Sequence, residues 1–514
     1  MGPWGPWPQQ PPQPPGPSQP PPRHGNKRIL LVVGAVVVAL GLVVAGGIGV
    51  YVGFVDRMMK GIQPISADPL DNDPAKDWQP GPGAVLNGKV AWSDTFVEND
   101  PFDAHPIGYW LTDSTFVRGS HSRLVAYQRK SGQKVWQLDA PKDRKFCGMT
   151  TSTDGRTGAL ALDVESTKRS ELTKLPERVC KDVQLVDLSS GQARWTTNFP
   201  AKTATGTPSS AVLELVGNVV IFQSDADGFG VEVTTGKRLW STQKLKRGEY
   251  DCTPQDLMPD PTAGHFVGLW RCGFGAATTM FTGIVAPASG RIGQVADLPK
   301  GSIDPSWAGG IGIASTEPTV VVIPSTSGTD TEGKGRIVVL DAAGKPTLSI
   351  PQTGSYGTLD LTATGSSTDV AVPDAGRDRF RMAVVDGRTL YATTVLGVSQ
   401  SGQENVVVAF DLATGKPRWT GKAGNGDTVK VVGADKDGAI AMSAGTYQDP
   451  PQVLRYAAAD GKRAELGPPY PRDYISTPIL TWMIWADNQV IMVPWKELPS
   501  VIGAPPPSSV WAFG

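Results

Sequence analysis

The sequence predicts an all-β fold, an eight-bladed β-propeller whose last blade is closed by strands from both ends of the chain. One transmembrane helix and a disordered proline-rich tail are predicted to precede this body. Three observations lead to this expectation: a glycine that recurs with a tryptophan four residues later, short strand-like segments separated by turns, and one long apolar segment near the N-terminus. Short strands with regular turns and no long helical periodicity after residue 60 favour an all-β body.

A glycine turn recurs along this body. Eight such glycines stand 44 to 71 residues apart, at positions 88, 132, 191, 236, 290, 344, 415 and 461. Repeats of about this length are typical of propeller blades. In five repeats a tryptophan follows the glycine by four residues, in the pairs Gly88 and Trp92, Gly132 and Trp136, Gly191 and Trp195, Gly236 and Trp240, and Gly415 and Trp419. Gln, Leu and Glu stand at that place after the glycines at 290, 344 and 461.

These glycines and tryptophans are predicted to be structural docking residues. Glycine permits a tight turn without a side-chain clash. An indole that lies against the neighbouring blade buries a large apolar area. We therefore expect the motif to pack blades together rather than to bind a ligand.

The segments between the glycines contain the strands of seven blades. Near the C-terminus, LTWMIWADNQVIMVPW (480–495) predicts a hairpin and SSVWAFG (508–514) a third strand, but no Gly-Trp strand follows them. Conversely, LNGKVAW (86–92) has a Gly-Trp strand with no blade before it. Joining the two groups makes the eighth blade of a propeller over residues 84–514, and closure removes the open edges of the sheet array.

The N-terminal region predicts a membrane anchor. Residues 1–28 form a proline-rich tail, with eleven prolines in the first 22 positions, and such a composition is typical of disorder. Residues 29–55 carry no charge, and a helix of this length reaches about 40 Å, enough to span a hydrocarbon core of about 30 Å. Residues 56–83, rich in Pro, Asp and Gly, are read as a linker.

The four cysteines predict two disulfides. Cys147, Cys180, Cys252 and Cys272 allow three connectivities, and free buried thiols are the alternative. We favour Cys147–Cys180 and Cys252–Cys272, because each pair falls within one interval between turn glycines. Disulfides place the body outside the cytoplasm, so we expect a single-pass plasma-membrane protein with a cytoplasmic N-terminus and an extracytoplasmic C-terminal domain.

Charge and motif content narrow the function. The formal net charge is −1, which supplies no electrostatic case for a nucleic-acid partner. The four histidines form no close pair, so no metal site is predicted. No catalytic or cofactor-binding residue is predicted, and the expected partners are the membrane, through the single span, and another envelope protein.

The stretch AFDLATGKPRW resembles the tryptophan-docking repeat of the PQQ-like, or quinoprotein-type, β-propellers. The family pattern is matched fully by Ala409, Asp411, Thr414, Gly415, Lys416 and Trp419. Partial matches are Ala126, Gly132 and Trp136; Asp187, Gly191 and Trp195; and Thr235, Gly236, Lys237 and Trp240.

This resemblance implies the fold more strongly than a function. Some members are dehydrogenases that hold pyrroloquinoline quinone with calcium, and others are non-enzymatic scaffolds or sensors, including the outer-membrane-assembly (BamB-like) propellers. The vicinal cysteine pair of the dehydrogenases is absent from this sequence. We expect a non-enzymatic, membrane-anchored scaffold or ligand sensor of the cell envelope, without a cofactor. The alternative is a quinone-dependent dehydrogenase with a divergent cofactor site.

Overall fold

A computed structural model gives the fold of the chain. The structure describes residues 79, 84–94, 106–169, 176–198, 211–224, 227–242, 245–273, 278–299, 311–325, 335–361, 383–395, 397–399, 402–422, 424, 428–443, 451–470, 481–494 and 510–514. The chain divides into two units, Met1–Asn72 and Asp73–Gly514. The predicted tail and the predicted span at 29–55 lie outside the described residues. No helix within the described part is long and apolar enough to cross a membrane.

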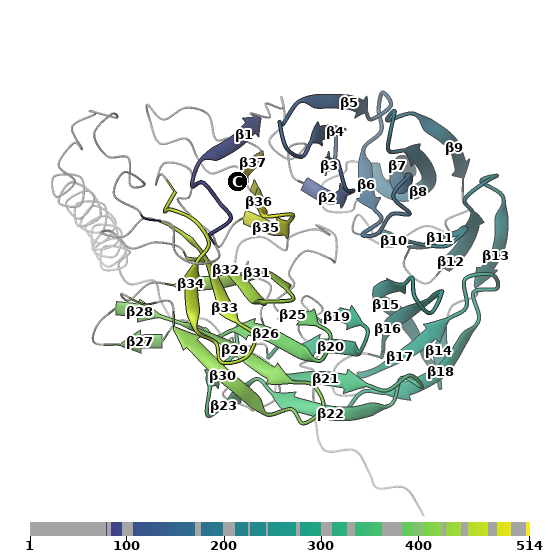
Figure 1. Cartoon of the computed structure of the whole chain (residues 1–514). Coiled ribbons are helices and arrows are strands. Elements are labelled where there is room, and N and C mark those ends of the chain that lie inside the picture. Colours follow the sequence, from purple (N-terminus) through teal and green to yellow (C-terminus); the bar gives the residue numbers. More distant parts are fainter. Residues whose placement is uncertain are drawn as a thin grey trace, which may run out of the picture. The chain divides into compact units, whose positions relative to one another are not determined.

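The second unit is a ring of antiparallel sheets, which we number as blades 1 to 8 (Figure 1). Blade 1 contains β2 (Pro106–Leu111), β3 (Thr115–Ser120), β4 (Arg123–Gln128) and β5 (Lys134–Asp139). Blade 2 contains β6 (Phe146–Met149), β7 (Thr157–Arg169), β8 (Pro176–Asp187) and β9 (Ala193–Asn198). Blade 3 contains β10 (Ala211–Val216), β11 (Val219–Ser224), β12 (Asp227–Glu232) and β13 (Arg238–Thr242). Blade 4 contains β14 (Lys246–Arg247), β15 (Tyr250–Asp260), β16 (His265–Cys272), β17 (Thr279–Val285) and β18 (Ile292–Asp297).

The second half of the ring repeats this plan. Blade 5 contains β19 (Gly312–Thr316), β20 (Thr319–Ile323), β21 (Arg336–Leu340) and β22 (Pro346–Pro351). Blade 6 contains β25 (Ala383–Asp386), β26 (Thr389–Thr393), β29 (Val406–Asp411) and β30 (Pro417–Lys422). Blade 7 contains β31 (Val429–Asp435), β32 (Gly438–Ser443), β33 (Val453–Ala457) and β34 (Arg463–Glu465). Two small hairpins are inserted, β23 (Thr353–Gly354) with β24 (Gly357–Thr358) and β27 (Gly397–Ser399) with β28 (Gly402–Glu404).

Blade 8 joins the two ends of the chain. It contains β35 (Thr481–Ala486), β36 (Gln489–Pro494), β37 (Val510–Phe513) and, as its outermost strand, β1 (Val90–Asp94). The last residue takes part in the closure, because the N–H of Asn87 donates to the carbonyl oxygen of Gly514 over 2.8 Å. The predicted all-β fold, the eight blades and the closure by both termini are therefore confirmed.

The core is divided among the seams between blades. Eight clusters of buried apolar side chains occur among the described residues, and each draws on two neighbouring blades. The cluster between blades 8 and 1, for example, joins Ile491 and Val493 of β36 to Phe116 and Val125 of blade 1. Strands rich in Val, Ile and Leu suit these sheets because both of their faces are covered by neighbouring blades.

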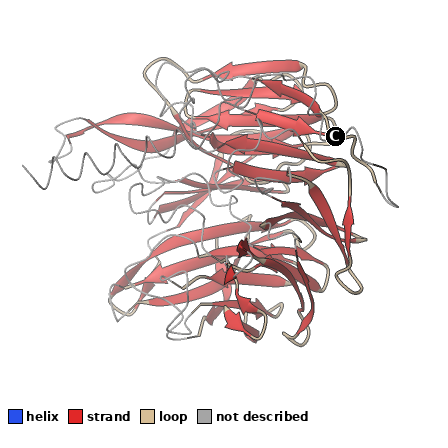
Figure 2. Ribbon diagram, turned by 90° about the vertical axis from the view of Figure 1, so that its left-hand side faces the viewer, coloured by secondary structure: helices blue, strands red, loops and turns tan. Residues whose placement is uncertain are grey.

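The two ends of the ring differ in their connections. In each antiparallel meander of four strands, counted from β15 in blade 4, the connections after the first and third strands lie at one end and the connection after the second strand lies at the other. We call the first end the turn end, since it holds the short turns between the first and second strands and the glycine turns. The opposite end, the insertion end, holds the β7–β8, β14–β15, β23–β24 and β27–β28 hairpins. Seen from the side, one long hairpin extends well beyond the blades (Figure 2).

Candidate functional site: the tryptophan docks and the insertion end

The five tryptophans of the repeat each lie on the glycine turn of the next blade. The indole Nε1–H donates to a backbone carbonyl oxygen in that turn, from Trp92 to Arg129 (2.6 Å), Trp136 to Leu188 (2.8 Å), Trp195 to Val233 (2.7 Å), Trp240 to Pro287 (2.6 Å) and Trp419 to Ala458 (3.1 Å). In each case the acceptor precedes the turn glycine by three residues. The repeat spacing is thus the spacing of a contact between neighbouring blades.

The turn glycines are required by both conformation and space. Gly191 has φ of +71°, in the left-handed region that side chains disfavour. A Cβ built there would lie 2.6 Å from the ring of Trp136, and one built on Gly461 would lie 2.4 Å from the ring of Trp419. The glycine therefore provides both the turn and the flat surface on which the indole packs.

The residue three places before the turn glycine makes backbone hydrogen bonds both within its own blade and to the preceding blade. In blade 2, the N–H of Leu188 donates to the carbonyl oxygen of Arg156 over 2.8 Å, while its own carbonyl accepts from Trp136. The same pair of bonds occurs at Arg129, Val233 and Ala458, whose N–H groups donate to Ser114, Asn218 and Asp437. Each of these residues joins the inner hairpin of its blade to the preceding blade.

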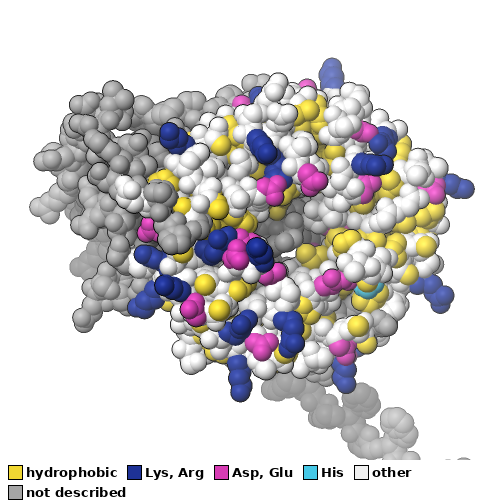
Figure 3. Space-filling model, viewed as in Figure 1, with side chains coloured by type: hydrophobic (Ala, Val, Ile, Leu, Met, Phe, Trp, Pro, Cys, Tyr) yellow, Lys and Arg dark blue, Asp and Glu magenta, His cyan; other side chains and the backbone are white. Residues whose placement is uncertain are grey.

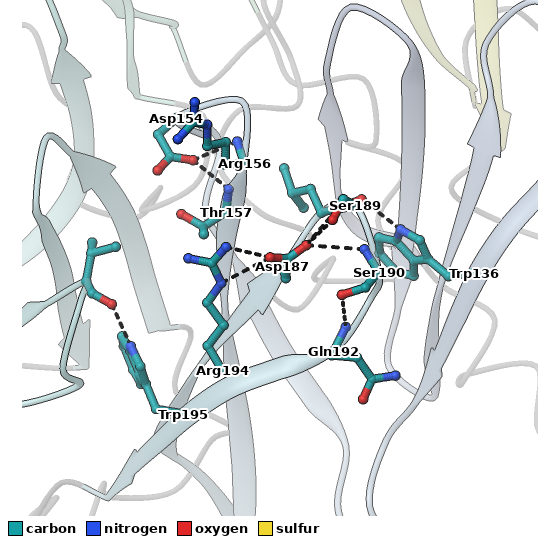
Figure 4. A network of polar contacts seen from close by, with 12 residues as sticks. Trp136, Asp154, Arg156, Thr157, Asp187, Ser189, Ser190, Gln192, Arg194 and Trp195 are labelled. Atoms are coloured by element: carbon teal, nitrogen blue, oxygen red, sulfur yellow. Dashed lines mark hydrogen bonds and ion pairs between the residues drawn. The ribbon is translucent and has the colours of Figure 1, made fainter.

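The acidic residue of the motif shapes the turn (Figure 4). The carboxylate of Asp187 accepts hydrogen bonds from the N–H and Oγ of Ser189 and from the Arg194 guanidinium, at 2.9, 2.5 and 2.5 Å. The Ser189 bonds and then the Arg194 contact hold the pKa of Asp187 well below its ordinary value. Asp411 and Asp341 accept N–H bonds from Ala413 and Ala343 in the same way.

Other side chains cover the glycine where the tryptophan is absent. Leu348, four residues after Gly344, lies against Gly415, where an added Cβ would be 2.8 Å from its Cδ1. Gly88 is covered by Pro468 of the segment after blade 7. The side chain of Gln294, at the third such place, lies outside the described residues.

The seam that closes the ring carries additional polar contacts. Trp92 stacks on Tyr127 with ring centroids 5.3 Å apart, and the Tyr127 hydroxyl donates to Asp94 over 2.7 Å. Burial, followed by the bond to Asp94, raises the pKa of Tyr127. Buried Arg129 pairs with Asp487 of the β35–β36 turn at 2.9 Å. These residues are far apart in the sequence, so local spacing could not identify them.

Both disulfides belong to single blades. Cys147 of β6 is joined to Cys180 of β8, and Cys252 of β15 to Cys272 of β16. The two predicted pairs are confirmed. Both bridges lie toward the insertion end, at the base of the β7–β8 extension and beside the β14–β15 hairpin. They fix insertions onto their blades rather than hold the ring closed.

The face in Figure 3 has mixed charge. Lysine and arginine side chains alternate with aspartate and glutamate around the central depression, with no large patch of one sign. Among the residues that the structure describes, no group of three His, Cys, Asp or Glu side chains could hold a metal ion.

One family model matches part of this chain. The family model of outer membrane protein assembly factor BamB matches residues 84–261. This match confirms the PQQ-like repeat that the sequence motif indicated. No curated protein matches the chain.

Several solved structures are similar to this chain at low sequence identity. BamB from Moraxella catarrhalis is 12% identical, with 79% of this chain and 95% of that chain covered and a TM-score of 0.40. The quinohemoprotein alcohol dehydrogenase ADHIIG from Pseudomonas putida HK5 is 12% identical, with 83% and 76% covered and a TM-score of 0.49. The C-terminal WD40 domain of Sif2 is 10% identical, with 84% and 99% covered and a TM-score of 0.42.

Proposed function

We propose that this chain is a non-enzymatic scaffold of the cell envelope, anchored in the plasma membrane, whose extracytoplasmic propeller binds a partner protein through the insertion end. The observation that carries this proposal is that the insertions are concentrated at one end of the ring. The inserted hairpins and both disulfides gather at one end, and binding residues are commonly found on loops that a rigid scaffold positions.

The motif residues support the same division. The turn glycines and tryptophans are engaged in joining blades, so the repeat itself serves the scaffold. The BamB family model over residues 84–261 is that of an assembly factor, which favours a protein partner over a small substrate. A more specific version of this proposal is that the insertion end also binds and senses a ligand.

Site-specific photocrosslinking in native membranes tests which end binds. A benzophenone amino acid at Lys142 or Tyr250, both exposed and toward the insertion end, should give a discrete crosslinked protein. The matched positions Ser190 and Asp460, exposed in glycine turns, should give none. Crosslinks from the turn-end positions alone would contradict the assignment of the binding end.

The enzymatic alternative has a separate test. Pyrroloquinoline quinone with calcium is titrated into the purified chain and followed by absorbance and calorimetry. Tight stoichiometric uptake with dye-linked oxidation of an alcohol would overturn the scaffold proposal.

Protease added to intact cells tests the proposed membrane topology. The propeller should be digested, and the N-terminal tail should be spared.

A further inference from the structure

The seam between blades 4 and 5 lacks both partners of the tryptophan contact. On blade 4, Gln294 stands at the place that a tryptophan occupies in five repeats. On blade 5, the N–H of Gly344 donates to the carbonyl oxygen of Asp341, three residues earlier, over 2.8 Å. In six other blades the acceptor stands four residues before the turn glycine, at Gln128, Asp187, Glu232, Ala286, Asp411 and Ala457. The indole is therefore absent from blade 4, and the turn that would receive it is one residue shorter.

The shorter turn also makes fewer bonds within its own blade. In five other turns the residue after this acceptor donates its N–H to the inner hairpin, from Arg129, Leu188, Val233, Leu412 and Ala458. Four of these five also accept an indole N–H through their carbonyl oxygens. Ala342, the corresponding residue of blade 5, donates no such bond to the described residues. The turn of blade 5 therefore lacks the geometry that receives an indole elsewhere.

The apolar core of this seam is entirely aliphatic. Its buried side chains are Val267, Leu269, Met280 and Leu298 of blade 4 and Ile313, Val321, Ile323, Val338 and Leu340 of blade 5. Among the described residues, no aromatic side chain belongs to this cluster, whereas each of the other seven clusters contains at least one. Aromatic side chains bury the largest apolar areas in a core. We therefore expect blades 4 and 5 to be held together less strongly than other neighbouring blades.

A buried carboxylate crosses the same seam. Asp256 of β15 is buried, and its Oδ2 accepts the backbone N–H of Ile313 in β19 over 2.7 Å. Gly312 leaves room for this carboxylate, since a Cβ built there would lie 3.2 Å from the same oxygen. The Thr282 hydroxyl also crosses the seam and donates to the carbonyl oxygen of Gly344, but its 3.3 Å is long for an O–H donor. The bond to the charged Asp256 is the stronger of the two.

We propose that the propeller opens reversibly at the seam between blades 4 and 5, and that the bond from Ile313 to Asp256 is the latch that closes it. Proteins open locally with free energies far below that of global unfolding, and the least stable contacts open first. Opening one seam leaves each of the two blades attached to its other neighbour, so their strands stay folded. The opening gives the middle of the ring an entrance from the side, and it does not depend on the identity of a partner.

Native-state labelling of single buried cysteines in the purified full chain tests this opening. Val321 is fully buried in the second strand of blade 5 and faces blade 4. Its matched control Val220 is fully buried in the second strand of blade 3 and faces blade 2, across a seam with a tryptophan contact. Iodoacetamide should modify Val321→Cys at least about tenfold faster than Val220→Cys, since only the first thiol is exposed by the local opening. Equal rates would overturn the proposal.

A second control separates opening of the seam from unfolding of blade 5. Val320 precedes Val321 in the same strand, is also fully buried, and faces blade 6. Val320→Cys should react as slowly as Val220→Cys. If Val320→Cys reacts as fast as Val321→Cys, blade 5 unfolds as a unit and the proposed opening is wrong. Ile323→Cys, in the same cluster as Val321, should repeat the fast labelling and replaces Val321→Cys if that variant does not fold.

Two further variants test the latch and the missing contact. Asp256→Ala removes the acceptor of the Ile313 N–H and should speed the labelling of Val321→Cys several-fold while leaving that of Val220→Cys unchanged. Equal labelling with and without Asp256→Ala would show that this bond is not the latch. Gln294→Trp, combined with a threonine inserted between Ala343 and Gly344, restores the turn length and the indole of the other repeats. This variant should slow the labelling of Val321→Cys toward the rate of Val220→Cys, and an unchanged rate would contradict the cause assigned to the opening.

Discussion

At the turn end of the ring the same contact recurs from blade to blade, whereas at the insertion end the connections differ in length and in chemistry. A glycine turn, an indole and one backbone residue form the repeated contact. At the other end, two residues join β3 to β4, while β7 and β8 of blade 2 are 13 and 12 residues long. Repetition at one end holds the ring together and leaves the other end free to diverge.

Loss of one repeated contact at the turn end should have the largest effect on stability. Trp136→Ala should destabilise the purified chain by about 3–5 kcal/mol, the usual range for loss of a buried aromatic side chain. Trp136 is 9% exposed, while its neighbour Val135 in the same strand is 48% exposed. Val135→Ala should therefore change the urea midpoint very little. Equal effects of the two variants would show that the indole is not buried in the seam.

The next largest effect is expected at the insertion end, where each disulfide fixes part of one blade. Replacing Cys147 and Cys180 together by alanine should cost roughly 3–4 kcal/mol on the chain-entropy account, since the bridge closes a 33-residue separation. The Cys252–Cys272 pair, with a 20-residue separation, should cost slightly less. Unfolding with and without reductant measures both effects. Amide exchange should rise in blade 2 for the first variant, and a rise spread evenly over the ring would contradict the local role.

The seam between blades 8 and 1 adds polar contacts to the repeated tryptophan contact, and their loss should have a smaller effect. Tyr127→Phe removes the hydroxyl that donates to Asp94 and should cost about 1.5–3 kcal/mol, the range for hydrogen bonds to charged groups. Tyr391→Phe, in a buried tyrosine of blade 6, provides a control for loss of a phenol hydroxyl. A midpoint unchanged by Tyr127→Phe would mean that the bond to Asp94 does not stabilise the seam.

The smallest effect concerns the shape of one turn. The pKa of Asp187 is lowered in the folded chain from an ordinary value of 3.8, so its contribution is present above about pH 4 and is lost as the pH falls toward the folded-state pKa. Asp187→Asn should cost about 0.5–1 kcal/mol at pH 7, a modest value because the ion pair with Arg194 is partly exposed. The difference from the wild type should shrink below pH 4. A difference that stays constant down to pH 2 would exclude the carboxylate charge as its cause.

The contrast between the repeated turn end and the variable insertion end also explains which features could be predicted from the sequence. The eight blades, the closure by both termini and the two cysteine pairs were predictable because they depend on local spacing that repeats. The carbonyl acceptors of the indoles were not, since any residue supplies a backbone carbonyl, and Arg129, Leu188 and Pro287 share no side-chain property. Contacts such as Arg129 with Asp487 join residues from opposite ends of the chain. The inserted hairpins and the length of β7 and β8 depart from the repeat period, so periodicity could not predict them.

The closure of blade 8 also orders events in time. Strand β1 is the first strand of the propeller to be synthesised, yet its sheet partner β37 is the last of the described strands in sequence order. Until β37 has been synthesised, β1 lacks this sheet partner, although Trp92 can already pack on the glycine turn of blade 1. Contacts between such distant segments slow folding, and an exposed strand edge during that interval invites aggregation. The ring is therefore most vulnerable until β37 has been synthesised, and removal of β37 should damage folding far more than its 4 residues suggest.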